Sequence, residues 1–175
     1  MFNLGLEIIP FFYNMLRLFL LRHGKATNNQ DDTNDFNRQL NKKGQIQANQ
    51  IGFILKEKGC PIDWILSSSA LRTTETAEII NHYFKLPKIQ FERDLYLADC
   101  LSILKRINQI QGLKNLLYVG HNNGISELAS YLSGKAFAMS TAELILIEFD
   151  FDSWNLVSAG TGKVIEKIVP DVHVI

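Results

Sequence analysis

Residues 15–24 read Met-Leu-Arg-Leu-Phe-Leu-Leu-Arg-His-Gly. The apolar run over 15–21 is typical of a short strand buried inside a parallel sheet, and it ends at a polar turn. Similar short runs at 64–66 and 116–119 are each followed by apolar residues at helical spacing. Strands that alternate with helices predict an α/β fold. We expect a three-layer α/β/α sandwich around a mostly parallel central sheet.

The other predicted elements follow from the spacing of apolar residues and from the positions of Gly and Pro. Helices are predicted from about 46 to 59, from about 70 to just before Pro87, over 101–110 and over 124–132. Extended segments are predicted over 89–97, 144–149 and 164–169, the last two joined by a turn near 160–162.

The composition excludes a global electrostatic attraction to anionic partners. The 175 residues include 18 basic and 18 acidic side chains, so the formal net charge is zero. We therefore expect neither a nucleic acid nor a membrane as partner, and any phosphate must bind a local cation cluster. Cys60 and Cys100 are interpreted as free thiols of a cytoplasmic protein, although the sequence alone does not exclude a disulfide.

Residues 1–14 are interpreted as an extension that precedes a single domain over 15–175. They are apolar, lack Lys and Arg, and are interrupted by Glu7 and Pro10. A secretory signal needs a basic start, and a membrane span needs a longer apolar run. The recognisable pattern begins directly at Met15, which we interpret as the native start.

Strong polar residues follow the predicted strands. Arg22, His23 and Gly24 come after the first strand, Arg72 lies just after the second, and His121 follows the strand at 116–119. Ligands of open α/β sheets bind at the carboxyl ends of the strands, so these residues are expected to share one crevice. Guanidinium groups match phosphate oxygens, and the crevice is therefore predicted to bind phosphate.

The chemistry expected there is nucleophilic catalysis by His23. The sequence contains neither a metal-site cluster nor a glycine-rich phosphate loop, so no metal and no cofactor are expected. Neighbouring guanidinium groups disfavour the imidazolium form and keep the His23 imidazole ready to attack phosphorus. Gly24 is interpreted as giving the substrate close access to the backbone, and His121 as a donor to a phosphate oxygen.

Three blocks in this order resemble the histidine phosphatase superfamily, which includes the phosphoglycerate mutases. Residues 20–26 resemble its Arg-His-Gly signature, and residues 65–77 its second block, with Ser69 and Glu75 at the usual Pro and Gln. Residues 119–124 resemble the Gly-His-Asn-Pro block, with Asn123 at the Pro, and residues 35–44 are similar to a loop-to-helix segment of small members. The resemblance covers about 16–149 and implies a phosphoglycerate mutase-like fold.

The resemblance also implies roles for single residues. His23 would be phosphorylated, and Arg22, Arg72 and His121 would complete the phosphate pocket. Asn29 falls at an Asn of the mutase-type pattern and is a weaker candidate for a phosphate contact.

One departure from the family pattern concerns the proton donor. Leu97 stands where mutases carry a catalytic acid; Asp99 is the alternative acid, and Asp94 a weaker one. An imidazole leaving group needs less help from an acid than an alkoxide does. The short segment between Phe84 and Leu101 also leaves little room for a capping insertion. Both features are similar to those of the small SixA-type phosphohistidine phosphatases.

The sequence therefore predicts a metal-independent phosphatase that acts on phosphohistidine proteins. Three alternatives stay open. One is a small-molecule phosphomonoesterase with Asp99 as its acid, and another is a mutase. The third is a non-catalytic phosphate-binding module, which would not need His23. The expected partner is a phosphorylated protein or a small phosphorylated substrate.

Overall fold

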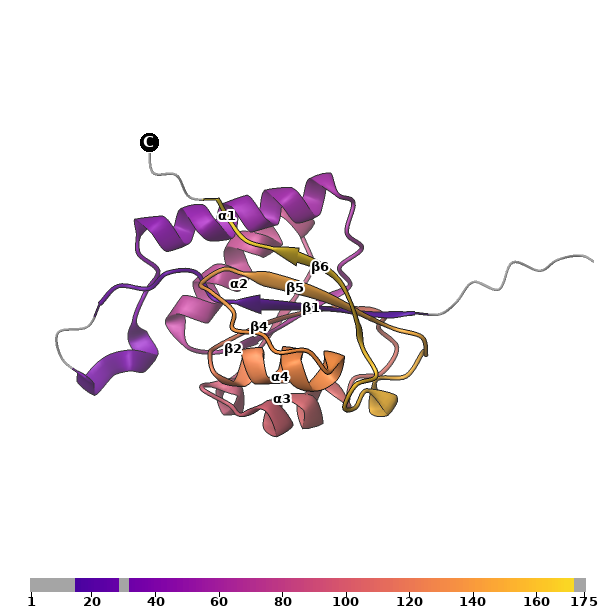
Figure 1. Ribbon diagram of the computed structural model, residues 1–175. Coiled ribbons are helices and arrows are strands. Elements are labelled where there is room, and N and C mark those ends of the chain that lie inside the picture. The colour runs from indigo at the N-terminus through magenta and orange to yellow at the C-terminus, as the bar shows by residue number, and fades with distance from the viewer. Residues whose placement is uncertain (1–14, 29–31, 172–175) are drawn as a thin grey trace, which may run out of the picture.

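The computed structural model describes residues 15–28 and 32–171 as one sheet with helices on both faces (Figure 1). The strands are β1 (Leu16–Arg22), β2 (Trp64–Ser68), β3 (Ile89–Glu92), β4 (Asn115–Gly120), β5 (Leu144–Phe149) and β6 (Lys163–Ile168). The helices are α1 (Lys42–Glu57), α2 (Leu71–Phe84), α3 (Cys100–Ile107) and α4 (Gly124–Ser133), with short 3-10 helices η1 (Asp32–Asn37), η2 (Arg93–Leu95) and η3 (Trp154–Leu156). The helices α1 and α2 cover one face of the sheet, and α3 and α4 cover the other (Figure 1). The predicted three-layer α/β/α sandwich is confirmed.

The strand β1 lies inside the sheet, between β4 and β5. Successive side chains of a strand point to opposite faces. Leu18 and Leu20 accordingly belong to the core beneath α3 and α4, whereas Phe19 and Leu21 belong to the core beneath α1 and α2. Because both faces are covered, the strand needs apolar residues at every one of these positions, which explains its unbroken apolar run.

The sheet follows the order β3-β2-β4-β1-β5-β6, and its first four strands are parallel. The strands β5 and β6 run antiparallel to their neighbours. In the parallel part, Arg22 pairs with Gly120, and Val119 is the partner of both Leu21 and Ser67. The carboxyl ends of β1, β2 and β4 therefore meet at one edge of the sheet.

The predicted elements differ from the observed ones mainly between β3 and α3. The prediction of an extended segment over 89–97 is wrong after Glu92, because η2 turns there and Leu95 enters the core with 3% exposure. The helix predicted over 101–110 ends early, at Ile107. The late strands lie within one residue of their predicted positions.

The two cysteines lie on opposite sides of the sheet. Cys60 packs against the core beneath α1 and α2, and Cys100 packs against the core beneath α3 and α4. The sheet separates the two thiols, and both cysteines are free.

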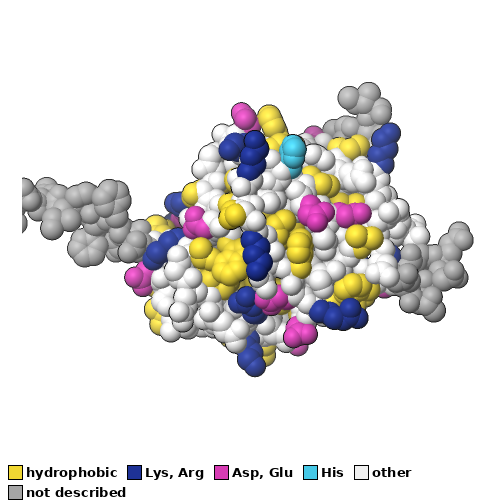
Figure 2. Space-filling model, turned by 180° about the vertical axis from the view of Figure 1, so that it is seen from behind, with side chains coloured by type: hydrophobic (Ala, Val, Ile, Leu, Met, Phe, Trp, Pro, Cys, Tyr) yellow, Lys and Arg dark blue, Asp and Glu magenta, His cyan; other side chains and the backbone are white. Residues whose placement is uncertain are grey.

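The described surface carries charges of both signs. Basic and acidic side chains are interspersed on the face seen from behind, so no single sign dominates it (Figure 2). Among the described helices, none has the length and apolarity required to cross a membrane. The prediction for residues 1–14 lies outside the described residues.

Candidate active site

Four polar side chains meet where the parallel strands end. Arg22 and His23 follow β1, His121 follows β4, and Arg72 lies in the first turn of α2, which follows β2. The ring centroids of His23 and His121 are 5.2 Å apart, and Nε of Arg72 lies 3.3 Å from Nε2 of His23. The structure thus brings together the four residues that the sequence predicted to share one crevice.

These four residues line a cavity of about 370 Å³. Its other lining residues are Lys25, Ala26, Asp35, Arg38, Leu97, Asn122 and Thr141. Arg72 and His121 are each 3% exposed, and His23 is 8% exposed. Charges in such a place are screened less by water than charges on an open surface.

The backbone selects the tautomer of His23. Its Nδ1 lies 2.7 Å from the carbonyl oxygen of Gly24, a group that only accepts hydrogen bonds, so Nδ1 carries the proton. The other ring nitrogen, Nε2, carries the lone pair, which accepts the N–H of Nε of Arg72. Burial lowers the pKa of His23 to about 4. The hydrogen bond to Gly24 opposes this shift, and the positive charges of Arg72 and Arg22 add to it. The imidazole is therefore neutral at pH 7, it lines the cavity, and its unprotonated nitrogen is Nε2.

The hydroxyl group of Ser68 is the partner of one ring nitrogen of His121. Oγ of Ser68 lies 2.9 Å from Nε2 of His121 and also accepts the backbone N–H of Ala70. If the hydroxyl donates to Nε2, the proton of the neutral ring sits on Nδ1, which is buried without a partner among the described residues. Burial is the main cause that lowers the pKa of His121 to about 3, and the electrostatic effects of His23 and Arg72 lower it further. His121 thereby gains one unused donor.

Arg22 has a second unused donor. Its Nη1 donates to the carbonyl oxygen of Met139 over 2.7 Å, while its Nε is buried without a partner in the described part of the chain. Burial lowers the pKa of Arg22, and the nearby carboxylate of Glu143 opposes that shift. Buried polar groups are normally hydrogen-bonded, so unused donors beside a cavity point to a ligand rich in acceptors.

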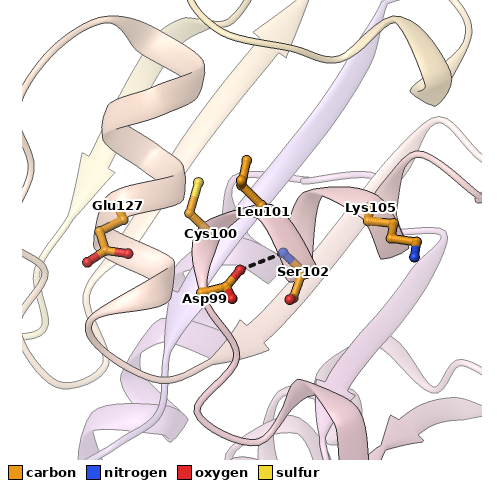
Figure 3. Close-up of a pocket in the computed structure, with 6 residues that line it drawn as sticks. All are labelled: Asp99, Cys100, Leu101, Ser102, Lys105 and Glu127. Carbon is orange, nitrogen blue, oxygen red and sulfur yellow. Dashed lines mark hydrogen bonds between the residues drawn. The ribbon is translucent and has the colours of Figure 1, made fainter.

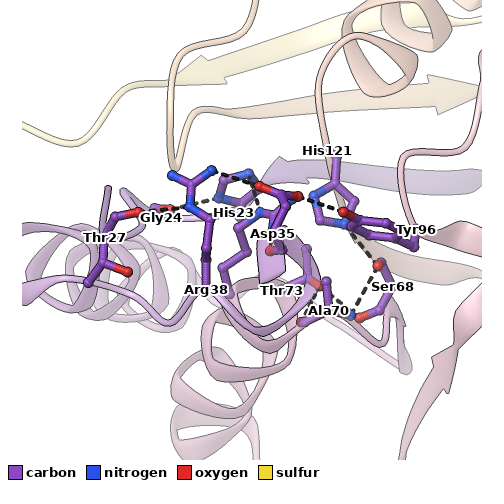
Figure 4. Close-up of polar contacts among 11 residues, drawn as sticks. His23, Gly24, Thr27, Asp35, Arg38, Ser68, Ala70, Thr73, Tyr96 and His121 are labelled. Carbon is purple, nitrogen blue, oxygen red and sulfur yellow. Dashed lines mark hydrogen bonds and ion pairs between the residues drawn. The ribbon is translucent and has the colours of Figure 1, made fainter. Parts of the chain in front are cut away.

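Three residues without a predicted role complete the polar network of the site. Asp35 accepts hydrogen bonds from Arg72, Arg38 and Tyr96 at 2.9, 2.8 and 2.6 Å (Figure 4). Burial alone would raise the pKa of Asp35, but Tyr96, Arg38 and Arg72 together hold it well below its usual range. Asp35 and Arg38 lie in residues 35–44, and the family resemblance of this segment was the one sequence signal that could have pointed to them. Nothing in the sequence singled out Tyr96.

The structure gives a packing reason for glycine at position 24. A Cβ atom there would lie 2.6 Å from the carbonyl oxygen of Gly44, at the start of α1. The backbone N–H of Gly24 donates to Oγ1 of Thr76 on α2, and its carbonyl accepts from His23. The absent side chain therefore serves the packing of this loop against α1, and the interpretation as access for the substrate stays a prediction.

The carboxylates predicted as weaker candidates do not line this cavity. Asn29 lies outside the described residues. Asp99 caps α3 by accepting the backbone N–H of Ser102 over 2.8 Å, and it lines a separate pocket (Figure 3). The hydrogen bonds from Ser102 lower the pKa of Asp99, the opposite of what a proton donor at pH 7 requires. Asp94 is exposed and does not line the cavity.

Leu97 stands at the position where the sequence resemblance implied an acid in mutases. It lines the cavity, is 54% exposed and has a left-handed backbone with φ of 49°. In the described part of the chain, no cluster of three or more His, Cys, Asp or Glu side chains is arranged to hold a metal ion.

Comparisons with known proteins agree with this geometry. A family model for the histidine phosphatase superfamily (branch 1) matches residues 18–96. An uncharacterised protein of Picosynechococcus is 30% identical over 122 residues, covering 67% of this chain and 73% of that protein. The chain belongs to the histidine phosphatase superfamily. The recognition made from the three sequence blocks is confirmed, and the family together with the matches to phosphatases supports a phosphatase-type hydrolase.

Two further matches extend the comparison. An uncharacterised chloroplast protein of Arabidopsis thaliana is 28% identical over 170 residues, covering 89% of this chain and 78% of that protein. A solved structure of the protein histidine phosphatase SixA with tungstate has a TM-score of 0.76 at 22% identity, covering 89% of this chain and 97% of that one. At this identity the likeness concerns the fold, and it confirms the predicted fold class.

Proposed function

We propose that this chain is a metal-independent phosphatase that forms a phosphohistidine on His23, and that its preferred substrate is a protein carrying phosphohistidine. The observation that carries the proposal is the placement of Nε2 of His23. That nitrogen is unprotonated, belongs to a ring that lines the cavity, and accepts a hydrogen bond from the buried guanidinium group of Arg72, which must release it before attack. A neutral imidazole in this position has the properties required of a nucleophile toward phosphorus.

In the first step, the Nε2 lone pair of His23 forms a bond to phosphorus while the bond from phosphorus to the leaving group breaks. In this scheme the side chains of Arg72, Arg22 and His121, which line the cavity, donate to the phosphoryl oxygens. Fixed donors of this kind stabilise the charge of the transition state without reorganising. The phosphorylated ring keeps its Nδ1 proton, which the Gly24 carbonyl continues to accept.

In the second step, water attacks phosphorus, the bond from phosphorus to Nε2 breaks, and neutral His23 is restored. The proton lost by water leaves with phosphate or passes to solvent. Inorganic phosphate then dissociates, and no group other than water is consumed.

The choice of phosphohistidine rests on the leaving group. An alkoxide must receive a proton as it departs, whereas an imidazole can depart already protonated. Leu97 has no proton to donate, Asp99 lines another pocket, and Asp35 is held ionised by its three donors. The SixA protein that shares this fold is named a protein histidine phosphatase, which supports the same choice.

The test compares a phosphohistidine protein with an alkyl phosphate such as glycerol phosphate, both with a metal chelator present. Wild type and His23→Ala are measured, with His82→Ala as the control, since His82 is an exposed residue of α2. We expect turnover of the phosphohistidine protein that is lost in His23→Ala and kept in His82→Ala. Equally fast turnover of the alkyl phosphate would favour the small-molecule phosphomonoesterase. Activity that survives in His23→Ala would overturn the proposed mechanism.

A further inference from the structure

In the proposed function Arg72 binds phosphate, but in this structure its two terminal nitrogens donate hydrogen bonds to Asp35. Nη2 of Arg72 donates to the Asp35 carboxylate over 2.9 Å, and Nη1 donates to the Asp35 backbone carbonyl over 2.6 Å. The remaining nitrogen of the Arg72 guanidinium group, Nε, donates to Nε2 of His23. A phosphoryl group that binds Arg72 through a terminal nitrogen must therefore compete with Asp35.

The two partners differ in their freedom to move. The side chain of Arg72 is 4% exposed, whereas that of Asp35 is 37% exposed. Arg72 projects from the first turn of α2, while Asp35 belongs to the short η1 segment. The carboxylate can turn toward solvent, but the guanidinium group is enclosed by the site. The exchange of partners at Arg72 is therefore expected to occur by movement of Asp35.

We propose that the carboxylate of Asp35 competes with phosphoryl oxygens for Arg72 and so determines how readily the site releases phosphate. This proposal rests on the proposed function, because it takes Arg72 as a phosphate ligand. When phosphate departs, the Asp35 carboxylate returns to the buried guanidinium group of Arg72, which would otherwise have no anionic partner. An unpaired buried charge is strongly unfavourable, so this replacement lowers the free energy of the empty site and favours dissociation of the product.

The balance of charges around the cavity explains how the Asp35 carboxylate would affect phosphate release. Arg22, Arg38 and Arg72 all line the cavity, and Asp35 is the carboxylate among its lining residues. Three guanidinium groups would hold a phosphate dianion tightly in a buried site, which slows turnover when product release is limiting. Asp35 offsets part of that attraction through direct contacts with two of the three arginines.

Tyr96 positions the competitor. Its hydroxyl group donates to the Asp35 oxygen that also accepts from Arg72, over 2.6 Å. Its ring packs edge-on against His121, with centroids 5.5 Å apart, so the hydroxyl is held in place (Figure 4). Removal of this hydroxyl should loosen the carboxylate and thereby help phosphate to bind.

The test measures the dissociation constants of inorganic phosphate and tungstate by calorimetry for wild type, Asp35→Asn and Asp94→Asn. Asp94 is an exposed carboxylate of η2, so its substitution removes one negative charge without touching Arg72. We expect Asp35→Asn to bind phosphate about 10-fold more tightly, roughly the effect of one charge-assisted hydrogen bond. Asp94→Asn should stay within about twofold of wild type. The inhibition constant of phosphate in turnover should fall with the dissociation constant.

A double-mutant cycle with Tyr96→Phe tests the mechanism and keeps the proposal falsifiable if Asp35→Asn folds poorly. Tyr96→Phe should tighten phosphate binding in the wild-type background but have no further effect in Asp35→Asn. Unchanged or weaker phosphate binding in both single variants, with binding still abolished by Arg72→Ala, would overturn the role of Asp35 alone. Phosphate binding that does not depend on Arg72 would overturn the proposed function as well.

Discussion

Oγ of Ser68 lies 2.9 Å from Nε2 of His121, and both residues are buried. Ser68 is the last residue of β2, and His121 directly follows the neighbouring strand β4. The pairing of two parallel strands thus positions a hydroxyl group that orients an imidazole ring. When this hydroxyl group donates to Nε2, the N–H of the neutral His121 ring lies on Nδ1.

Ser68→Ala is expected to reduce turnover more than it reduces stability at neutral pH. Without the hydroxyl group, Nε2 of His121 loses its buried partner, and the ring is no longer held in the tautomer that donates from Nδ1. A loss of about 10-fold in kcat/KM is expected from one unsatisfied buried group. Steady-state kinetics on the phosphohistidine protein measures it. The control is Ser69→Ala, which removes the neighbouring half-buried hydroxyl group. Equal effects of the two substitutions would contradict the role of Ser68.

The phosphoenzyme is expected to carry phosphate on Nε2 of His23. The Gly24 carbonyl accepts the proton of Nδ1 over 2.7 Å, so only Nε2 presents a lone pair to the cavity. Protein labelled with ¹⁵N at histidine, phosphorylated with phosphoramidate and studied by NMR, reports which nitrogen is coupled to ³¹P. His23→Ala should give no signal. Phosphate on Nδ1 would show that the Gly24 contact does not select the nucleophile.

The stability of the protein is expected to fall as the pH decreases from about 6.5 toward 4. Unfolded histidine binds its proton near pH 6.5, whereas the pKa of folded His23 is about 4 and that of His121 about 3. In this window the unfolded state binds more protons, so the free energy of unfolding rises with pH. His23 alone should lower the free energy of unfolding by about 2 kcal/mol between pH 7 and pH 5. Urea unfolding at several pH values measures it.

The variant His23→Gln separates this effect from general acid sensitivity. It removes one titrating group, so its stability should depend less steeply on pH than that of wild type between pH 5 and 6.5. An identical slope in the two proteins would mean that His23 keeps an ordinary pKa in the folded state.

Gly24→Ala is expected to destabilise the fold. The new methyl group would lie 2.6 Å from the Gly44 carbonyl oxygen, and a backbone atom cannot move aside as a flexible side chain can. Overpacking of this kind lowers the free energy of unfolding by about 1–3 kcal/mol. Gly44→Ala should have a similar effect, because its methyl group would meet the backbone of Lys25. Urea unfolding at pH 7 measures both, and a Gly24→Ala protein as stable as wild type would contradict this packing.

Much of the fold could be predicted because the deciding patterns are local. The apolar run of β1 reports burial on both faces, and the late strands were placed within one residue. The prediction was wrong beyond Glu92, where Leu95 turns into the core through a 3-10 turn. An apolar residue in a short segment satisfies strand and turn patterns equally well, so only packing decides between them.

The sequence by itself determined which side chains follow the parallel strands, because the polar residues come directly after an apolar run or, for Arg72, at the start of the next helix. That was enough to bring Arg22, His23, Arg72 and His121 into one site. Only the tertiary structure decided which contacts tune these residues. The Asp35–Arg72 contact joins residues 37 apart in the chain, and the Asp35–Tyr96 contact joins residues 61 apart. Hydrogen bonds depend on distance and direction, and for residues so far apart these are set by how the loops pack, which no local pattern records.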